Sequence, residues 1–234
     1  MKSAKNSKSS SRKLKARIIC YFLGLFIMTM GIALSVKSNL GVSPVSSIPY
    51  TITLVWGIEM GKATILFHVV LVLIQIILLR KNFKIKNLLQ IAIGIVFGYF
   101  TTFCNSLASL LPSTDNFLIR LAMLLASTVL VALGIFFYMP ADIMPLAGEG
   151  CMMAVSDITK KPFPKVKICF DVTMVVISVT TCLIALHRPG SVGIGTVIAA
   201  FLVGTVLSIF VKFFGEARNR LLIPEKPEDR NNIK

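Results

Sequence analysis

Charged residues are scarce in this sequence, and acidic residues are the scarcest. Asp and Glu together number 10 against 25 Lys and Arg, so that 15% of the residues are charged, whereas a soluble domain carries about 25%. The mean hydropathy of +0.81 agrees with this low charge. A soluble fold of 234 residues cannot bury so much apolar sequence, so we expect an integral membrane protein.

Residues that carry enzyme chemistry are missing or isolated. The two histidines are too few for a metal cluster, and the sequence holds no H-E-x-x-H, G-x-S-x-G or Walker motif. None of the five cysteines forms a C-x-x-C pair, and most fall inside apolar runs, where cysteine acts as a small hydrophobic residue. We therefore expect no enzyme, no catalytic residue, no bound metal and no cofactor.

The basic residues do not form the pattern of a nucleic-acid-binding protein. The formal net charge is +15, but the lysines and arginines flank apolar runs instead of gathering on one face with interleaved aromatic residues. In a membrane protein, basic residues beside apolar runs mark the loops that stay in the cytoplasm. We expect the lipid bilayer as a partner and no nucleic acid.

Long uncharged runs dominate the chain, and a spanning helix needs about 20 apolar residues. The uncharged runs are Ile18–Val36, Ser38–Ile58, Ala63–Leu79, Asn87–Leu111, Leu121–Ala141 and Pro189–Val211, while Ile168–Leu186 holds one acid, Asp171. Every run except Ser38–Ile58 is interpreted as a span. The pattern predicts an all-α membrane protein with six transmembrane helices, near residues 18–36, 63–79, 88–110, 119–140, 167–186 and 191–211.

The basic residues also predict the orientation of these spans. With the N-terminus inside, 21 of the 25 basic residues fall on the cytoplasmic side, and the others are Lys37, Lys62, Arg120 and Arg188. This asymmetry predicts a multi-pass protein of the plasma or inner membrane with both termini in the cytoplasm. Residues 1–17 and 215–234 are then a basic and a polar cytoplasmic tail. The first apolar run is an uncleaved span, since no small-x-small site follows it.

Ser38–Ile58 is long enough to cross the membrane but has the composition of a broken segment. It carries Pro44 and Pro49 among several serines and threonines, and proline disrupts a helix interior. A crossing here would also place the Arg80–Lys86 cluster outside. We therefore expect a broken or re-entrant segment that enters from outside and returns, covered by protein or lining a wet cavity.

The second half of the chain echoes the first at an offset of 103 residues. Gly31-Ile32 matches Gly134-Ile135, and further matches are Lys62 with Lys165, Ile65 with Ile168, Phe67 with Phe170 and Val72 with Val175. Residues 18–111 and 119–214 would each hold three spans with a broken segment after the first, the second such segment being Met139–Ile158. An odd number of spans places the halves in opposite orientations, the inverted-repeat plan of many secondary transporters. Chance similarity between apolar segments is the alternative.

Four short motifs occur in order along the chain. They are Gly31-Ile-Ala-Leu, Leu40-Gly41-Val-Ser-Pro44, Lys167-Ile-Cys-Phe-Asp171 and Gly193-Ile-Gly-Thr196. In this order and spacing the chain resembles the YczE/YyaS/YitT family of bacterial membrane proteins over most of residues 17–214. The resemblance implies a six-helix membrane protein without a firmly assigned activity, in a family where some members look like accessories of secondary-metabolite production or transport.

Acids inside the broken or spanning segments are candidates for a binding site, because an ionisable residue in the membrane is costly. Glu149 lies between two glycines in the second broken segment. If that segment re-enters the membrane, Glu149 binds a cation or carries a coupling proton; otherwise it is a solvated loop residue. Asp142 follows Pro140-Ala141 and either belongs to the same site or caps the next helix.

Asp171 lies inside the fifth predicted span, one helical turn after Lys167. Residues four apart share a helix face, so the two can pair. We interpret the pair as linked to substrate or proton and facing the bundle; the alternative is an interfacial pair with Lys167 reaching the headgroups. His68 takes the position of Asp171 in the first half and is interpreted as a hydrogen-bonded structural residue.

Gly41-Val-Ser-Pro44 precedes a predicted half-helix over Val45–Gly57. The free N–H groups and the positive dipole end of such a helix can bind an anion or a carboxylate, and Ser43, Ser46 and Ser47 add hydroxyls. The alternative is a hairpin used for packing alone.

Two functions remain open. The first is a small secondary transporter or exporter that binds a small solute or ion near the membrane midplane, between the broken segments, and works by one repeat rocking against the other. Its predicted site residues are Gly41, Ser43, Pro44, Ser47, Asp142, Glu149, Lys167 and Asp171. The second is a non-transporting accessory that scaffolds another complex. A polar cavity at mid-depth would favour the first and a filled core the second. A chain this small would enclose a pathway more easily as a homodimer.

Overall fold

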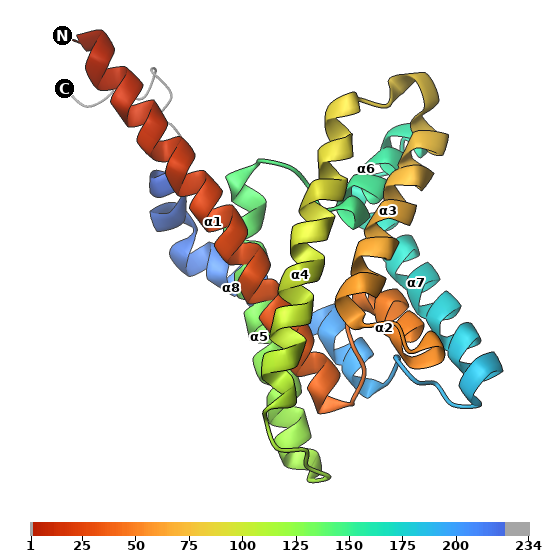
Figure 1. Cartoon of the computed structure of the whole chain (residues 1–234). Helices are drawn as coiled ribbons and strands as arrows, with labels where there is room; N and C mark the ends of the chain where they lie inside the picture. Colours follow the sequence, from red (N-terminus) through yellow and green to blue (C-terminus); the bar gives the residue numbers. More distant parts are fainter. Residues whose placement is uncertain (1, 223–234) are drawn as a thin grey trace.

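The computed structural model describes the backbone of residues 2–222, which is mostly helical and contains no strand. Its helices are α1 (Lys2–Ser38), α2 (Pro44–Trp56), α3 (Met60–Leu79), α4 (Leu89–Ser109), α5 (Phe117–Tyr138), α6 (Ala147–Thr159), α7 (Phe163–Leu186) and α8 (Ile194–Leu222) (Figure 1). Short 3-10 turns lie between α3 and α4 and after α5: η1 (Arg80–Asn82), η2 (Ile85–Leu88) and η3 (Met139–Ala141).

Six helices of the described chain are long and apolar enough to cross a membrane: α1, α3, α4, α5, α7 and α8. Each corresponds to one predicted span, and the bounds agree to within about four residues except at the start of α1 and the end of α8, so the prediction of six spanning helices is confirmed. Residues 2–17 and 215–222, expected as tails, continue the helices of the first and last spans. The rest of the predicted C-terminal tail, residues 223–234, lies outside the described residues.

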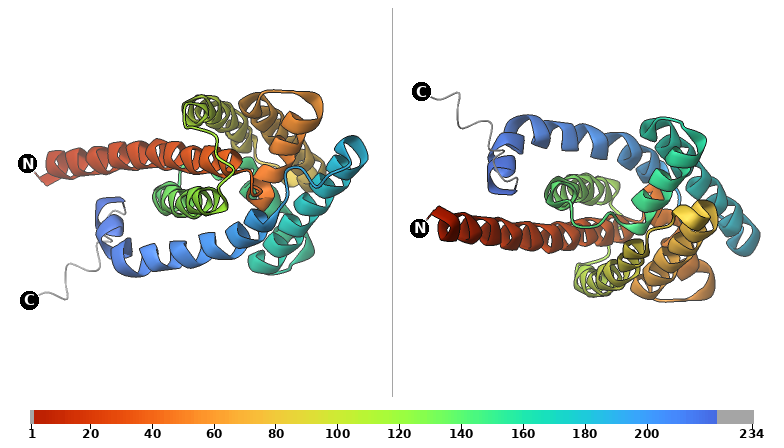
Figure 2. Two further views of the ribbon diagram at one scale, coloured as in Figure 1. Left: turned by 90° about the horizontal axis from the view of Figure 1, so that it is seen from below. Right: turned by 90° about the horizontal axis from the view of Figure 1, so that it is seen from above.

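The helices α1 and α5 run antiparallel at the centre of the bundle, with α1 packed against α4, α5 and α8 (Figures 1 and 2). Glycines bring the two backbones into contact. A Cβ added at Gly31 would lie 2.8 Å from the Ser127 carbonyl oxygen, and one added at Gly134 would lie 2.7 Å from the Gly24 carbonyl oxygen. Small residues at such crossings permit the close packing on which helix association in a membrane depends.

Two arginines fasten the ends of this antiparallel pair. Arg17 in α1 donates hydrogen bonds of 2.8 and 3.0 Å to the carbonyl oxygens of Ala141–Asp142, just after α5. Arg120 in α5 donates to the carbonyl oxygens of Ser38–Asn39, at the end of α1. Carbonyls at a helix end lack helical partners, and each arginine supplies them. The two clamps are related by the offset of 103 residues.

The two short helices repeat at the same offset. Each has 13 residues, and Ala147–Thr159 begins and ends 103 positions after Pro44–Trp56. Left-handed backbone precedes both, with a φ of 51° at Asn39 and 48° at Asp142, and follows both, with 68° at Gly57 and 56° at Lys160. Chance similarity between apolar runs does not by itself produce left-handed turns at matching positions, so these turns favour the predicted repeat over that alternative.

The contacts between the halves are also exchanged by the offset. α2 packs against α7 as α6 packs against α3, and α1 packs against α4 as α5 packs against α8. With α1 and α5 antiparallel, this exchange supports the predicted inverted repeat, whose two-fold axis would lie in the membrane plane. One pair departs from the pattern, since α3 packs closely on α4 whereas α7 and α8 form no comparable contact.

The turns of the bundle separate into two ends. Figure 1 shows the start of α1, the α3–α4 turn and the α6–α7 turn toward one end, and the α4–α5 loop toward the other. The start of α1 and the end of α8 lie on the same side in Figure 2. The basic clusters Arg80–Lys86 and Lys160–Lys167 therefore lie at the end where α1 begins, as in the predicted topology.

Replacing Gly134 by valine should force α1 and α5 apart, since the added Cβ alone would lie 2.6 Å from the Met28 Cβ. Overpacking of this kind costs about 1–3 kcal/mol, which we expect as a loss of unfolding free energy of the purified protein in detergent. Gly204→Val in α8, where an added Cβ meets nothing within 4 Å, is the matched control. Equal losses in the two variants would contradict the close α1–α5 contact.

The predicted orientation can be tested at the two ends of α4. Lys84 lies in the α3–α4 turn and Ser113 in the α4–α5 loop. In a background with the five native cysteines replaced, a membrane-impermeant maleimide should label the Ser113→Cys variant in intact cells. The Lys84→Cys variant should be labelled only in inverted vesicles, because its basic loop is predicted to be cytoplasmic. The opposite pattern would show that the termini lie outside.

Candidate functional site

The helix α2 runs from the middle of α7 toward the end of that helix. Ser47, which is fully buried, accepts a hydrogen bond of 2.8 Å from Ser178 and lies 3.4 Å from the carbonyl oxygen of Met174, in the middle of α7. One turn later, Thr51 shares a 2.7 Å hydrogen bond with Ser191, in the loop that follows α7. The segment after α1 thus passes into the middle of the bundle and returns, the path predicted for a broken segment.

The first turn of α6 reaches the same depth and meets that of α2. A Cβ added at Gly148 would lie 3.7 Å from Val45 Cγ1 and 4.0 Å from Leu71 Cδ1, in the middle of α3. The N-terminal ends of α2 and α6 therefore face each other near the middle of the spans. Each end carries the positive partial charge of a helix dipole, so the meeting point favours negative charge or electron-rich groups.

A pair of buried amides packs against the start of α6. Gln75 and Gln90 are almost completely buried and are joined by a 2.9 Å hydrogen bond, and Gln75 also donates to the carbonyl oxygen of Ala147 at 3.1 Å. A Cβ at Gly150 would lie 2.6 Å from Gln90 Nε2. Only glycine fits there, so the two amides fix the position of α6 on α3 and α4.

The loop before α2 crosses the loop before α8 with the backbones in contact. Gly41 has a φ of 109°, and a Cβ there would lie 2.6 Å from the backbone nitrogen of Gly193. The Gly195 N–H donates a 2.8 Å hydrogen bond to the carbonyl oxygen of Leu40. Gly41, a predicted site residue, thus belongs to the crossing that positions the start of α2.

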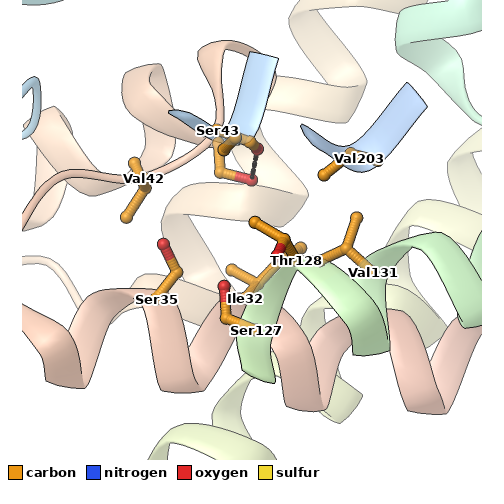
Figure 3. A pocket seen from close by; sticks show the side chains of 10 residues that line it. Ile32, Ser35, Val42, Ser43, Ser127, Thr128, Val131 and Val203 are labelled. Carbon is orange, nitrogen blue, oxygen red and sulfur yellow. Dashed lines mark hydrogen bonds between the residues drawn. The ribbon is translucent and has the colours of Figure 1, made fainter. Parts of the chain in front are cut away.

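Two small cavities lie beside Ile32 and Ser46, near the middle of α3, α4 and α5. The first measures about 10 Å³. Its polar lining consists of hydroxyl residues, some of which point into it in Figure 3: Ser35, Ser43, Ser46, Ser127 and Thr128. The second measures about 30 Å³ and is lined by Thr64, His68 and Thr101 together with Ser46 and apolar side chains. One water molecule needs roughly 10–15 Å³, so the middle of the bundle contains polar, water-sized spaces.

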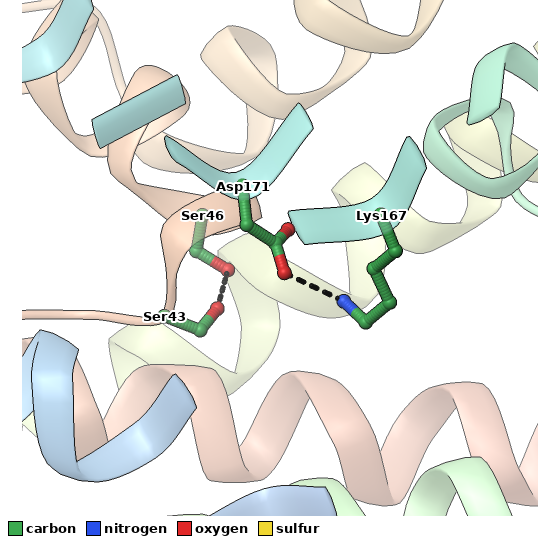
Figure 4. Close-up of polar contacts among 4 residues, drawn as sticks. All are labelled: Ser43, Ser46, Lys167 and Asp171. Carbon is green, nitrogen blue, oxygen red and sulfur yellow. Dashed lines mark hydrogen bonds and ion pairs between the residues drawn. The ribbon is translucent and has the colours of Figure 1, made fainter. Parts of the chain in front are cut away.

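The predicted pair of Lys167 and Asp171 is present on α7. Lys167 Nζ lies 2.8 Å from Asp171 Oδ2, with Asp171 21% and Lys167 50% exposed. The other oxygen, Asp171 Oδ1, is buried and has no hydrogen-bond partner among the described residues. In Figure 4 the Asp171 carboxylate points toward Lys167 and lies beside Ser46, whose hydroxyl accepts a 3.0 Å hydrogen bond from Ser43. One carboxylate oxygen is therefore available beside the positive end of α2.

Glu149 lies half-buried in the first turn of α6, where its carboxylate accepts a hydrogen bond from the Tyr138 hydroxyl. The same hydroxyl accepts a 3.2 Å hydrogen bond from the Leu146 N–H. Glu149 is therefore not a solvated loop residue, although it lines neither cavity. It ties the start of α6 to the end of α5.

Asp142 is exposed in the loop before α6. The capping role considered for it is wrong, because Leu146 occupies the N-cap position of α6 and Asp142 lies four residues earlier. The structure thus gathers part of the predicted set around the start of α2, namely Ser43, Pro44, Ser47, Lys167 and Asp171. Glu149 stands at the start of α6, and Asp142 lies apart.

Several polar residues of this region were missed by the sequence analysis. The cavity residues Thr64, Thr101 and Ser127 are single hydroxyls or hydroxyl pairs inside apolar spans. A hydroxyl in an apolar run does not by itself indicate a site. The signal that was available is helical spacing, since Thr64 and His68 are four residues apart and therefore share a face. The clamp arginines Arg17 and Arg120 were counted only as topology signals, although the offset of 103 residues aligns them.

The geometry defines a class of protein: a polytopic α-helical membrane protein in which each half places a short helix after its first span, with a polar centre between the two short helices. Comparison with protein families then identifies the family within this class. Residues 15–212 match the family of unknown function DUF6198, and the chain belongs to this family.

Two relatives from Bacillus subtilis (strain 168) are similar to the chain. The "uncharacterized protein YyaS" is 26% identical over 198 residues, which cover 82% of this chain and 90% of the relative. The "uncharacterized membrane protein YczE" is 24% identical over 197 residues, which cover 84% and 86%. These matches confirm the family resemblance of the four motifs. No solved structure matches the chain.

A comparison of two glycines tests the loop crossing. Gly41 and Gly57 both have positive φ, but an added Cβ meets nothing within 4 Å at Gly57. Gly57→Ala should lose only the roughly 1–2 kcal/mol of a left-handed alanine. Gly41→Ala should lose about 1–3 kcal/mol more, from overpacking against Gly193. The unfolding free energy in detergent measures both, and equal losses would contradict the crossing.

Proposed function

We propose that the protein is a small secondary transporter or exporter of the plasma or inner membrane, which binds a small solute or ion where the first turns of α2 and α6 meet. The observation that carries the proposal is this meeting at mid-depth, where a Cβ added at Gly148 would lie 3.7 Å from Val45 Cγ1, beside hydroxyl-lined cavities. Many secondary transporters hold their substrate between discontinuous helices whose N-termini point at a central site.

The polar groups around the start of α2 support binding rather than packing alone. A carboxylate within membrane-spanning segments is costly unless it is paired or functional. Asp171 is paired through Oδ2 only, while Oδ1 is buried without a partner among the described residues. The hydroxyls of Ser43 and Ser46 lie beside Asp171, on the side away from Lys167 (Figure 4). A bound solute or ion would complete this set.

The packing suggests which parts move. Because α2 packs against α7 and α6 against α3, rocking one sequence repeat as a unit would break both contacts. We propose instead that α2, α3, α6 and α7 move together against the α1–α5 pair, which glycine contacts and arginine clamps hold rigid. The cavities hold only one or two water molecules, so this arrangement corresponds to the closed stage of such a cycle.

The proposal involves no enzymatic step and keeps both termini in the cytoplasm. The alternative function, a non-transporting accessory or scaffold, requires a core that solvent never enters. Accessibility of the first turns of α2 and α6 to water therefore separates the two functions.

The test uses single cysteines in a background without the five native ones. The variants Ser43→Cys, Ser47→Cys, Gly148→Cys and Glu149→Cys report on the two first turns, and Gly148 accepts a side chain because an added Cβ makes only ordinary contacts of 3.7 and 4.0 Å. We expect a membrane-impermeant maleimide to label the positions in α2 and its entrance from outside only. The positions in α6 should be labelled from the cytoplasmic side only.

Two control variants define the lowest and the highest extent of labelling. Ser208→Cys on the exposed face of α8 should remain unlabelled within the lipid, and Lys84→Cys in the α3–α4 turn should label fast in inverted vesicles. If neither first turn is labelled from either side while Lys84→Cys reacts, there is no solvent pathway and the scaffold function replaces the transporter.

A further inference from the structure

The cavity of about 30 Å³ around His68 is built entirely by the first half of the chain. Its lining comes from α1, α2, α3 and α4. His68 is buried, with only 6% of its surface exposed, and its ring lies over Gly94, where a Cβ would come 2.7 Å from the His68 Cβ. The absence of a side chain at position 94 makes the room that the imidazole occupies.

The polar groups that α3 and α4 present to this cavity are acceptors. His68 Nδ1 lies 2.8 Å from the carbonyl oxygen of Thr64. A carbonyl only accepts, so Nδ1 carries a proton, and in the neutral form of the ring Nε2 has a free lone pair. Thr64 and Thr101 donate their hydroxyl protons to the carbonyl oxygens of Met60 and Phe97, at 2.7 and 2.8 Å. Their oxygens keep lone pairs for a guest.

The size and the walls of the cavity restrict that guest further. A volume of about 30 Å³ suits one or two non-hydrogen atoms, which excludes any solute with more non-hydrogen atoms than that. The Phe97 ring, whose centroid lies 5.6 Å from that of His68, and the neighbouring Phe67 also line the cavity, and aromatic faces attract cations. The guest must therefore be small and donate hydrogen bonds, as water and the ammonium ion both do, and the aromatic walls favour the cation of the two.

We propose that this cavity binds an ammonium ion, held by His68, Thr64 and Thr101. Ammonium donates hydrogen bonds in four directions and matches the three acceptors. Sodium and potassium have no hydrogen to donate, and hard cations prefer oxygen ligands to imidazole. Ser46 lines the cavity and lies beside Asp171 in Figure 4, although Asp171 itself is not among the lining residues. A role for this ion as substrate or coupling ion rests on the proposed transport function; its binding does not.

The experiment measures binding without transport. The unfolding temperature of the purified protein in detergent is measured at constant pH and ionic strength with rising concentrations of ammonium chloride. Parallel series use potassium, sodium or tetramethylammonium chloride in place of the ammonium salt. A ligand that binds only the folded state raises the unfolding temperature. We expect a saturable rise with ammonium alone. Potassium is the matched ion, since it has nearly the same radius but no N–H, and tetramethylammonium carries the charge without N–H groups.

Variants of the lining residues test whether the ammonium-dependent rise in unfolding temperature comes from this cavity. Thr101→Val keeps the side-chain shape and removes one acceptor, and because a hydrogen bond to a charged group contributes about 1.5–3 kcal/mol, half-saturation should require at least about tenfold more ammonium. Thr205→Val in α8 is the matched control: Thr205 is exposed and bonds back to the Phe201 carbonyl as Thr101 does to that of Phe97. His68→Phe should abolish the ammonium effect.

Each outcome decides the proposal. An equal rise with potassium or sodium, no rise with ammonium, or unchanged ammonium dependence in Thr101→Val overturns it, and the Thr101→Val result stands even if His68→Phe does not fold. If ammonium fails to bind while the first turns of α2 and α6 are labelled from opposite sides, the ammonium site falls and the transporter proposal remains. Ammonium binding without such labelling would leave a bound ion in a protein that does not transport.

Discussion

The contact between the backbones of α1 and α5 is the constraint on which the rest of the structure depends. In a bilayer the hydrophobic effect does not draw helices together, so packing and interhelical hydrogen bonds must stabilise the bundle. Gly24, Gly31 and Gly134 let the backbones of α1 and α5 come into direct contact. The clamp of Arg17 then ties the loop after α5 to α1, and the clamp of Arg120 ties the end of α1 to the start of α5. The direction in which the chain leaves α1 and α5 is thereby fixed.

The two short helices depend on that fixed direction. After each clamp the backbone turns left-handed, at Asn39 and at Asp142, and five residues later a 13-residue helix begins. Neither α2 nor α6 is long enough to cross the membrane, and their unpaired N-terminal N–H groups would be costly in lipid. The structure covers these ends with protein: α2 packs against α7, and α6 packs against α3.

Much of the fold was accessible from the sequence because it follows from apolar run length and charge placement. The six spans, the half-helix after Pro44 and the Lys167–Asp171 pair all came from local patterns that the membrane enforces. The contacts that position the site did not, since they join residues far apart in the chain. Gly41 was predicted to bind a ligand from its place before a helix, yet it is fixed by the crossing with Gly193. Asp142 was expected at a helix start, but the loop to Leu146 separates it from α6.

The two halves share a framework but differ in the polar groups mounted on it, and the difference follows a simple electrostatic rule. The offset of 103 residues places Glu149 where the first half has Ser46, and His68 where the second half has Asp171. The first turn of α6 thus carries its own carboxylate, whereas the first turn of α2 has a serine and faces a carboxylate on α7 (Figure 4). Each positive helix end therefore lies beside one acid, Glu149 for α6 and Asp171 for α2. A second acid at either end would repel the first. The neutral His68 completes this arrangement, because a second acid in its place would leave a carboxylate in the cavity among Phe67, Phe97 and hydroxyls already bonded to the backbone.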